Sequence, residues 1–574
     1  MDNQRLVTWG VFGLMVLWTY QAWIKDYGPQ PVATPPTVEE PQQGDAADTS
    51  LPSLSEGDSA GQDLPDVAAP GGGSAPLETA ATVIRVTTDV MVVKISVRGG
   101  TLLGATMLNY PVAKDQPDTL VQLLSVDSED LGLIQTGLNT GVEGDAMPSH
   151  TALFQSRRTD YELDGADEIV VPLSWSDGSG VEVEKRYRFR RGSYAVQVEQ
   201  QVNNGSDAPW QGGAYAQIVR RLRANERSMF NVDSYSYDGP IIYDGDKSEK
   251  LDADDLDNGR GYSFKSEQGW VASIQHHFLS AIVPQRDGVY DFAVTLSSAG
   301  NSTRSSTISK KQTVAPGASK TFTTTLFVGP KLQSQLEEID PKLKLTVDYG
   351  WLTILSGPMF WLLSKLFGVF GNWGVAIMGV TILIKLAFYK LTEASGRSMA
   401  KMRNLQPRMK ALQDRYKDDR QQLSQAMMEL YKREKVNPAA GCLPILIQMP
   451  FFLSFYWVLV ESVEMRQAPF ALWITDLSSK DPFFILPLIM GVAMFLQQKL
   501  NPTPADPVQA KVMQIMPIMF TGFFAFFPSG LVLYWATNTV LSIAQQWKIN
   551  KVVEAEAKKK KSGKKKPKKE KGND

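Results

Sequence analysis

The sequence predicts a multi-domain membrane protein: an α-helical six-span membrane bundle with a cytoplasmic helical hairpin, plus a large all-β domain. Two patterns predict this fold class. Strongly apolar runs recur along the chain, and residues 82–331 instead alternate apolar and polar side chains with a period of two. The apolar runs are residues 6–24, 373–391, 442–460, 482–496, 512–527 and 531–547.

Charge is segregated along the 574 residues, and this segregation is the third observation. Residues 28–347 carry 27 basic and 43 acidic residues, whereas residues 348–574 carry 30 basic and 16 acidic residues. An acidic soluble part and a basic, apolar part indicate opposite sides of a membrane. The first 27 residues are neutral overall.

The N-terminal part predicts an anchor followed by a tether. Residues 1–27 contain the first apolar run, which is long and lacks a nearby small-residue cleavage site, so we expect an uncleaved signal anchor. Residues 28–80 lack aromatic and basic side chains and are rich in Pro, Gly, Ala and Ser. Such a composition predicts a disordered tether.

Residues 81–345 are predicted to form an antiparallel β-sandwich. Residues 181–189 alternate strictly, turn at Arg191-Gly192-Ser193 and resume as a second alternating run at 194–198, and similar runs occur at 90–97 and 320–328. Residues 332–340 should form a short helix that leads out of the sandwich.

Few residues could hold a metal, and we predict no metal site and no cofactor. Cys442 is the single cysteine, which excludes an intrachain disulfide and a multi-cysteine site. His276 and His277 are adjacent, and adjacent side chains point apart on a strand or helix, so we expect ordinary fold histidines. The aspartates at 252, 254, 255 and 257 lack the glycine and glutamate of an EF-hand and indicate a solvated loop.

Residues 346–372 are apolar but interrupted by Gly357-Pro358 and Lys365. This pattern favours an amphipathic helix that lies in the membrane interface. The second span, residues 373–391, contains a cation, Lys385. A charged residue inside a span is rare because a central lysine costs roughly 2.5–3.5 kcal/mol even on insertion scales.

Two interpretations of Lys385 remain open. Its stem is long enough to reach toward the membrane interface near Lys390, as lysines close to helix ends do. Alternatively, Gly374, Met378, Thr381 and Lys385 recur at helical spacing and form a small, polar face that suits the wall of an aqueous groove.

Residues 392–440 predict two antiparallel helices rich in methionine. From residue 390 to 435 there are 12 basic and 6 acidic residues, which places the hairpin in the cytoplasm by the positive-inside rule. Its methionines either form the hairpin core or offer a soft surface for varied apolar partners. The candidates for substrate or ribosome contact are Met399, Met402, Met409, Met427 and Met428.

Residues 441–547 hold spans three to six. The last span carries Tyr534, Asn538 and Gln545 on one face, which either bond between helices or line the same groove as Lys385. The tail, residues 548–574, holds 12 lysines and is expected to be a disordered cytoplasmic segment. Counting spans from the hairpin places both termini in the cytoplasm and the β domain outside.

Several function classes lose support. The sequence contains no Walker A motif, dinucleotide fingerprint, HExxH or CxxC, so neither an ATP-driven pump nor a redox enzyme is indicated. Two other functions remain open at this point. The first is a secondary transporter, although repeated halves are not evident. The second is a membrane-anchored carbohydrate-binding enzyme with its site in the β domain.

Long stretches resemble the YidC/Oxa/Alb family of bacterial membrane protein insertases, in its long Gram-negative form. The resemblance covers the whole chain and is strongest between residues 373 and 550. Its most specific stretches are Ser398-Met-Ala-Lys-Met-Arg, Lys435-Val-Asn-Pro, Gln448-Met-Pro, Arg466-Gln-Ala-Pro-Phe-Ala-Leu-Trp-Ile and Phe527-Pro-Ser-Gly-Leu-Val-Leu-Tyr.

The resemblance implies a bacterial inner membrane protein with a periplasmic β-super-sandwich and a hydrophilic groove. The family's groove cation, usually arginine, falls on Lys385, which keeps the charge without the guanidinium fork. The family's paired tyrosines fall on Tyr534 and Trp535, so the second position carries a tryptophan instead of a tyrosine. The groove contacts implied are Lys385, Thr381, Met378, Tyr534, Trp535, Asn538 and Gln448.

The function implied is that of a membrane protein insertase and chaperone, with no enzymatic reaction. Its partners would be nascent integral membrane proteins, the Sec translocon with its accessory membrane proteins, and membrane lipid. The ribosome and the signal recognition particle receptor are further candidates, and no nucleic-acid substrate is expected.

Overall fold

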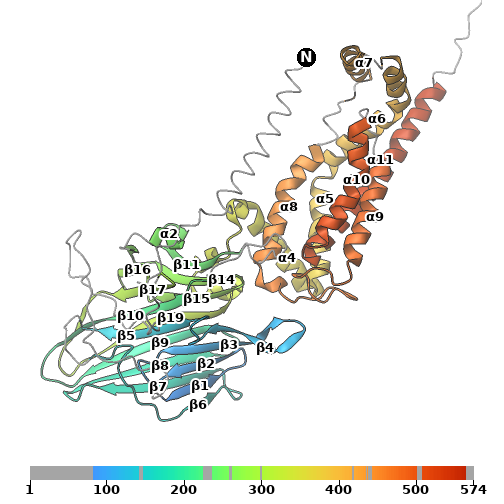
Figure 1. Cartoon of the computed structure of the whole chain (residues 1–574). Helices are drawn as coiled ribbons and strands as arrows, with labels where there is room; N and C mark the ends of the chain where they lie inside the picture. Colours follow the sequence, from blue (N-terminus) through green and yellow to red (C-terminus); the bar gives the residue numbers. More distant parts are fainter. Residues whose placement is uncertain are drawn as a thin grey trace, which may run out of the picture.

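The computed structural model describes residues 82–140, 147–223, 236–256, 261–297, 300–416, 419–434, 436, 443–500 and 507–563. A β-rich part and a helical part lie at opposite ends of the molecule (Figure 1). The predicted anchor, residues 1–27, and tether, residues 28–80, lie outside the described residues, as do Cys442 and Asp257.

Two sheets form the β domain, as predicted. The larger sheet has eleven strands in the order β13-β16-β17-β10-β5-β3-β2-β1-β6, with β18 beside β10 and β4 beside β3. Its strands are β1 (Val83–Thr87), β2 (Met91–Ser96), β3 (Leu102–Ala113), β4 (Gln116–Leu124), β5 (Gly132–Asn139), β6 (Asp160–Glu162), β10 (Trp210–Arg221), β13 (Tyr262–Ser266), β16 (Tyr290–Leu296), β17 (Ser302–Ser309) and β18 (Gln312–Val314).

The second sheet has eight strands in the order β12-β11-β14-β15-β19-β9-β8-β7. Its pairs are all antiparallel, whereas β1 and β6 of the first sheet are parallel. Its strands are β7 (Glu168–Ser176), β8 (Val181–Arg190), β9 (Ala195–Asn204), β11 (Asp238–Tyr243), β12 (Ser248–Lys250), β14 (Trp270–Gln275), β15 (Phe278–Pro284) and β19 (Ser319–Pro330).

The period-two pattern determines which side chains of a strand enter the core, as β8 illustrates. Val183, Tyr187 and Phe189 are buried, as is Lys185, while the alternate residues Glu184, Arg186 and Arg188 are partly exposed. Because alternate side chains of a strand face opposite sides, one face of β8 joins the apolar core between the sheets. The predicted runs at 181–189, 90–97 and 320–328 correspond to β8, β2 and β19.

Lys185 is a charged exception on the buried face of β8. Its ammonium donates to the carbonyls of Gly99 (2.7 Å) and Thr136 (2.8 Å), and it lies 4.8 Å from the ring centroid of Phe154. Burial lowers the pKa of Lys185 from 10.5 to about 7. The amine therefore binds its proton less tightly in the folded chain than in the unfolded chain.

Lys185→Met should remove a pH dependence of stability. Between pH 7 and pH 10.5 the unfolded lysine holds more proton than the folded one, so wild-type stability should rise with pH across that window. The rise between pH 7 and pH 9.5 should be about 3 kcal/mol, and the variant should lack this component. Thermal unfolding of both proteins in detergent at several pH values measures the difference; parallel pH profiles would contradict this assignment.

Short helices lead from the β domain to the helical part. The predicted helix at 332–340 corresponds to α3 (Gln333–Ile339), which is followed by two 3₁₀ turns, η2 (Leu343–Thr346) and η3 (Gly350–Leu352). The aspartate-rich segment contains α2 (Ala253–Leu256). Within the described residues, no group of three or more His, Cys, Asp and Glu side chains is arranged to hold a metal ion.

The helical part contains one long helix for most of the apolar runs (Figure 1). Helix α11 packs against α5, α6, α8 and α9, while α4 packs against α5 and α8. The helices are α4 (Thr353–Phe370), α5 (Trp373–Ala387), α6 (Tyr389–Arg415), α7 (Arg420–Arg433), α8 (Leu443–Glu461), α9 (Ile485–Leu500), α10 (Pro507–Phe524) and α11 (Ser529–Gly563), with a 3₁₀ turn, η5 (Val463–Met465), after α8.

By length and composition, α4 is able to cross a membrane, and the bent pair α5–α6 meets the same criterion if it counts as one span. Apolar helices of 10–17 described residues follow at Leu446–Glu461, Ile485–Leu500 and Lys511–Phe524. Among the described helices these features indicate a membrane-associated bundle. The count of six spans and the interfacial placement of residues 346–372 stay predictions.

The second span differs from its predicted end at residue 391. Helix α5 ends at Ala387, and α6 begins at Tyr389 with a bend of 69° between the two helices. The N–H of Phe388 points to the carbonyls of both Ile384 and Leu386, and its ring packs edge-on against Phe451 with centroids 5.2 Å apart. The helix that contains the first part of the predicted hairpin therefore begins at Tyr389, three residues before residue 392.

The basic tail also differs from the prediction, because α11 continues through Gly563 instead of ending near residue 547. Ile549 and Val553 are buried one turn apart and pack against Ala400 of α6. Arg397 of α6 also forms an ion pair with Glu556 at 3.0 Å. Apolar and ionic contacts to the hairpin thus extend the helix into the lysine-rich segment.

Candidate substrate-contacting site in the membrane helices

The helix that carries Lys385 is fixed at its start by local capping. Gly371 has a φ of 64°, which glycine adopts without strain, and it ends α4. The side-chain oxygen of Asn372 then accepts a hydrogen bond from the N–H of Val375, while its amide donates to the carbonyl of Phe470 at 2.8 Å. These contacts set the direction in which α5 enters the bundle.

One face of α5 turns toward the other helices. Gly374 and Thr381 are buried, and a Cβ at position 374 would lie 2.1 Å from the ring of Phe470. Met378 is half-buried against the core, whereas Leu386 is 63% exposed. The buried face of α5 therefore combines Gly374 and Thr381 of the predicted polar face with the large apolar residues Ile377 and Val380.

Lys385 reaches across to α11. Its ammonium donates to Ser542 Oγ at 2.7 Å, and Ser542 Oγ in turn donates to the carbonyl of Asn538 at 2.7 Å. The side chain is half-buried and bridges the two helices instead of extending along α5 toward its end. The contact thus joins the predicted cation to the predicted polar stripe.

Ser542 was missed by the sequence analysis, although a signal existed. It lies four residues after Asn538, and residues four apart share one helix face. Gln545, on the same helix, donates to the carbonyl of Tyr389 at 3.4 Å. The Oδ1 atom of Asn538 is buried and has no hydrogen-bond partner within the described part of the chain. This acceptor is the kind of group that a passing polar segment would satisfy.

Aromatic contacts join α8 to α11 next to this stripe. Tyr534 is buried and stacks on Phe455 with centroids 4.7 Å apart, and Trp535 meets Phe452 edge-on at 4.7 Å. Gln448 lies half-buried one turn before Phe452. The predicted groove residues therefore meet at two contacts of α11: Asn538 is linked to Lys385 of α5 through Ser542, and Tyr534 and Trp535 pack against α8, the helix that carries Gln448. Met378 lies on α5, seven residues before Lys385.

Thr381 is placed differently from the other six. It is buried, and its hydroxyl donates to the carbonyl of Ile377 at 2.7 Å within its own helix. A threonine hydroxyl that bonds four residues back offers a partner only its lone pairs. The hydroxyl proton of Thr381 is therefore already donated within α5.

The hairpin methionines divide between its core and its surface. Met409 and Met427 are buried with Leu405 and Leu430, and Met402 packs against this cluster. Met399 is half-buried, whereas Met428 is 38% exposed. The core interpretation therefore fits Met409 and Met427, and Met428 is the methionine of this set that is accessible to a partner.

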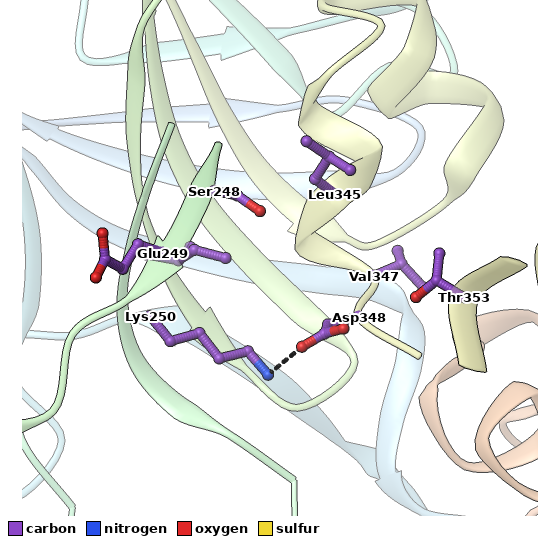
Figure 2. A pocket seen from close by; sticks show the side chains of 8 residues that line it. Ser248, Glu249, Lys250, Leu345, Val347, Asp348 and Thr353 are labelled. Carbon is purple, nitrogen blue, oxygen red and sulfur yellow. Dashed lines mark ion pairs between the residues drawn. The ribbon is translucent and has the colours of Figure 1, made fainter. Parts of the chain in front are cut away.

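A pocket of about 430 Å³ lies between the β domain and the start of α4, and its lining residues do not belong to α5, α8 or α11 (Figure 2). Lys250 and Asp348 face each other in it and form an ion pair at 2.9 Å. The third charged residue of the lining, Glu249, forms an ion pair with Lys247 at 3.0 Å. We do not place the substrate site there.

Comparisons with known proteins match both parts of the chain. Residues 83–362 match the family model described as YidC periplasmic domain, and residues 365–558 match the model described as 60Kd inner membrane protein. A solved structure titled "Active YidC insertase crystal structure with the first transmembrane domain resolved" is 20% identical, with a TM-score of 0.39, and the match covers 81% of this chain and 92% of that chain. A galactose mutarotase related enzyme from Lactobacillus acidophilus matches 43% of this chain and 97% of its own at 9% identity and a TM-score of 0.30.

Full-length relatives are much more similar. A membrane protein insertase YidC from Thioalkalivibrio sulfidiphilus is 46% identical over 97% of this chain and all of its own length. One from Methylococcus capsulatus is 48% identical over 96% of this chain and 99% of its own length. These relatives are named insertases rather than enzymes. The chain belongs to the YidC family of membrane protein insertases.

Proposed function

We propose that the chain inserts integral membrane proteins into a lipid bilayer through a polar site formed by α5, α8 and α11. The observation that carries this proposal is the contact between Lys385 and the Ser542–Asn538 pair, which holds a cation and a buried acceptor inside an apolar bundle. Polar groups at membrane depth are costly and usually mark a path for a polar substrate. Family membership and the names of the relatives support the same function.

In the proposed mechanism, a nascent chain first meets the hairpin, where Met428 and the half-buried Met399 offer soft apolar contacts. The short polar flank of the substrate then enters the site between α5 and α11. There, the charge of Lys385 and the free acceptor of Asn538 lower the cost of removing that flank from water.

Insertion is then completed by lipid burial of the apolar substrate segment. Exposed apolar side chains cover the outer faces of α9 and α10, for example Val492 and Ile518, so the substrate can leave the site against an apolar surface. The membrane potential adds about 2.3 kcal/mol per charge for each 100 mV. The chain itself forms and breaks no covalent bond in this scheme.

The placement that we propose is the bacterial inner membrane, with the hairpin and both termini in the cytoplasm and the β domain in the periplasm. Twelve basic residues in and around the hairpin favour this orientation. The proposed partners are nascent membrane proteins, the Sec translocon with its accessory proteins, the ribosome and the signal recognition particle receptor. The lysine-rich end of α11 would be attracted to anionic surfaces in a salt-dependent manner.

Reconstitution tests the proposal. The purified chain in liposomes should convert a short single-span substrate, added during translation, to a protease-protected form, and liposomes without the chain should not. The hairpin surface supplies a second arm: Met428→Asp should reduce protection more than Met427→Leu, which keeps the hairpin core apolar. Equal protection with and without the chain would refute the proposed function.

A further inference from the structure

The hairpin turn between β14 and β15 has an unusual composition. Gln275 pairs directly with Phe278, so the turn consists of two residues, His276 and His277. His276 has a φ of 47°, a left-handed backbone conformation that costs free energy for a residue with a Cβ atom. Two-residue turns of this kind favour Gly, Asn or Asp at such positions. Strain of this sort persists where side chains are needed for another purpose.

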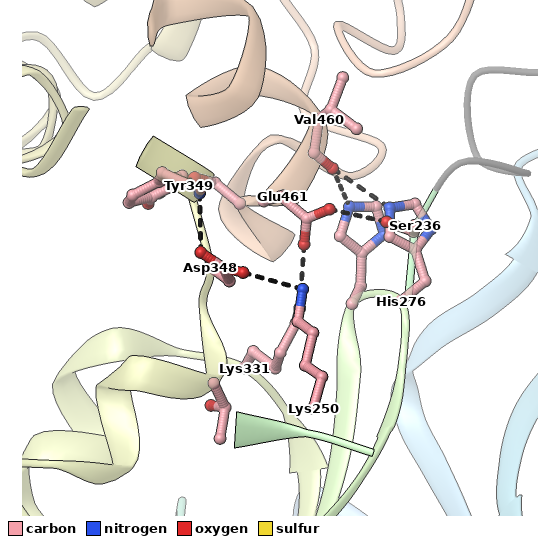
Figure 3. A network of polar contacts seen from close by, with 12 residues as sticks. Ser236, Lys250, His276, Lys331, Asp348, Tyr349, Val460 and Glu461 are labelled. Atoms are coloured by element: carbon pink, nitrogen blue, oxygen red, sulfur yellow. Dashed lines mark hydrogen bonds and ion pairs between the residues drawn. The ribbon is translucent and has the colours of Figure 1, made fainter. Parts of the chain in front are cut away.

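Both histidine side chains reach the end of α8. Their rings stack with centroids 3.7 Å apart, contrary to the expectation that adjacent side chains point apart. His276 Nε2 and His277 Nε2 lie 3.2 Å and 2.9 Å from the carbonyl oxygen of Val460 (Figure 3). Since a carbonyl only accepts hydrogen bonds, both nitrogens act as donors here.

This contact gives a hydrogen-bond partner to a carbonyl at the carboxyl end of α8. The last four carbonyls of an α-helix have no partner within the helix, and a helix end buried without partners is unfavourable. Val460 is the penultimate residue of α8 and is buried. The β domain therefore supplies, from outside the helix, the donors that the end of α8 lacks.

A buried ion pair stands beside the histidines. Lys331, at the end of β19, lies 3.1 Å from Glu461, and Ser236 donates to the other carboxylate oxygen of Glu461 at 2.7 Å (Figure 3). Tyr349 reaches the next residue, Ser462, at 3.3 Å. The last two residues of α8 and the residue after it are thus held by side chains from outside α8.

Burial keeps His277 neutral. Loss of water and the nearby positive groups of His276, Lys331 and Arg466 lower the pKa of His277 well below 6.5. A neutral imidazole that donates from Nε2 carries no proton on Nδ1, and Nδ1 of His277 has no partner within the described residues. The tautomer is therefore fixed by Val460.

We propose that His276 and His277 are positioning residues, retained in a strained turn because together they cap the carboxyl end of α8 and lock the β domain onto the membrane helices. The joint consists of His276, His277, Lys331 and Ser236 on one side and Val460 and Glu461 on the other. It lies at the opposite end of α8 from Gln448, so it sets the direction of a helix that carries part of the candidate site. The proposal does not depend on the proposed function, since its test measures local opening rather than insertion.

Hydrogen exchange of the full chain in detergent tests the cap. In His277→Leu, which fills similar space without a donor, exchange of the amides of residues 458–466 should rise about tenfold, because one buried hydrogen bond is lost. His277→Gln restores an amide donor of similar reach and should recover most of the protection. Equal exchange in the wild type, the leucine variant and the glutamine variant would overturn the cap.

His276→Gly tests the strain separately and is expected to fold, because glycine adopts a positive φ freely. Exchange within β14 and β15 should stay the same or slow down, whereas exchange of residues 458–466 should rise. An ordinary turn residue would change exchange only within β14 and β15, whereas a residue that caps α8 changes exchange at residues 458–466. Faster exchange in both segments, or no change at 458–466, would overturn the claim that the strained backbone of His276 is retained because its side chain caps α8.

Discussion

Lys385→Ala should reduce insertion of substrates with an acidic translocated flank by about tenfold or more. At an effective dielectric constant near 20, two charges about 8 Å apart attract by roughly 2 kcal/mol, and the alanine variant loses this attraction. Lys385→Glu should be worse for the same substrates, since attraction becomes repulsion. Lys385→Arg should retain insertion, because it keeps the cation.

The measurement is protease protection of one-span substrates with acidic or neutral flanks, at matched expression of every variant. Leu386→Ala is the matched control, because Leu386 is the next residue and faces outward from the bundle. It should insert both substrates as well as the wild type. Equal insertion by the lysine, alanine and glutamate forms would show that this lysine only bridges α5 and α11 and does not act on the substrate.

Breaking the buried pair of Lys331 and Glu461 should cost the most stability. Both side chains are buried, and the ion pair joins the β domain to α8. Lys331→Met leaves the carboxylate of Glu461 without its cation, and removing one partner of a buried pair typically costs 3–5 kcal/mol, here expected at about 4 kcal/mol. The double variant Lys331→Met with Glu461→Leu should lie within about 1–2 kcal/mol of the wild type, because no unpaired charge remains.

Thermal unfolding of the full chain in detergent, followed through tryptophan fluorescence, measures both effects. The exposed pair of Lys344 and Glu337 provides a control, since it has a similar distance of 3.1 Å but lies in water. Lys344→Met should change stability by roughly 1 kcal/mol or less. If the single and double variants at 331 and 461 were equally destabilised, the pair would not act as a coupled unit.

The sequence predicted the fold where a local pattern repeats. Period-two alternation located β2, β8 and β19, and one of the two interpretations of the hairpin methionines placed Met409 and Met427 in its core. These patterns are local because each residue's environment is set by the face of its own strand or helix. The class of the protein follows from such patterns together with charge segregation.

Features that depend on distant contacts were beyond sequence reasoning. Phe388 packs against Phe451 at the bend, and Ile549 and Val553 pack against Ala400 where α11 continues. In both cases a local rule was overridden by packing against a residue far away in the chain.

The candidate site was predicted in part for the same reason. Lys385 and the stripe on α11 could be found because each lies at helical spacing on its own helix. Their direct link through Ser542, and the capping of Val460 by two histidines, join segments more than 150 residues apart. Only the three-dimensional structure brings those segments together.

Site-specific crosslinking tests the central claim most directly, that substrates pass between α5 and α11. A photoreactive residue at Met378 or Asn538, on the bundle side, should crosslink to a ribosome-bound nascent membrane segment. The same residue at Leu386 or Val540, which are 63% and 52% exposed on the outer faces, should crosslink mainly to lipid. Nascent-chain crosslinks from the two outer positions that equal or exceed those from Met378 and Asn538 would contradict the account.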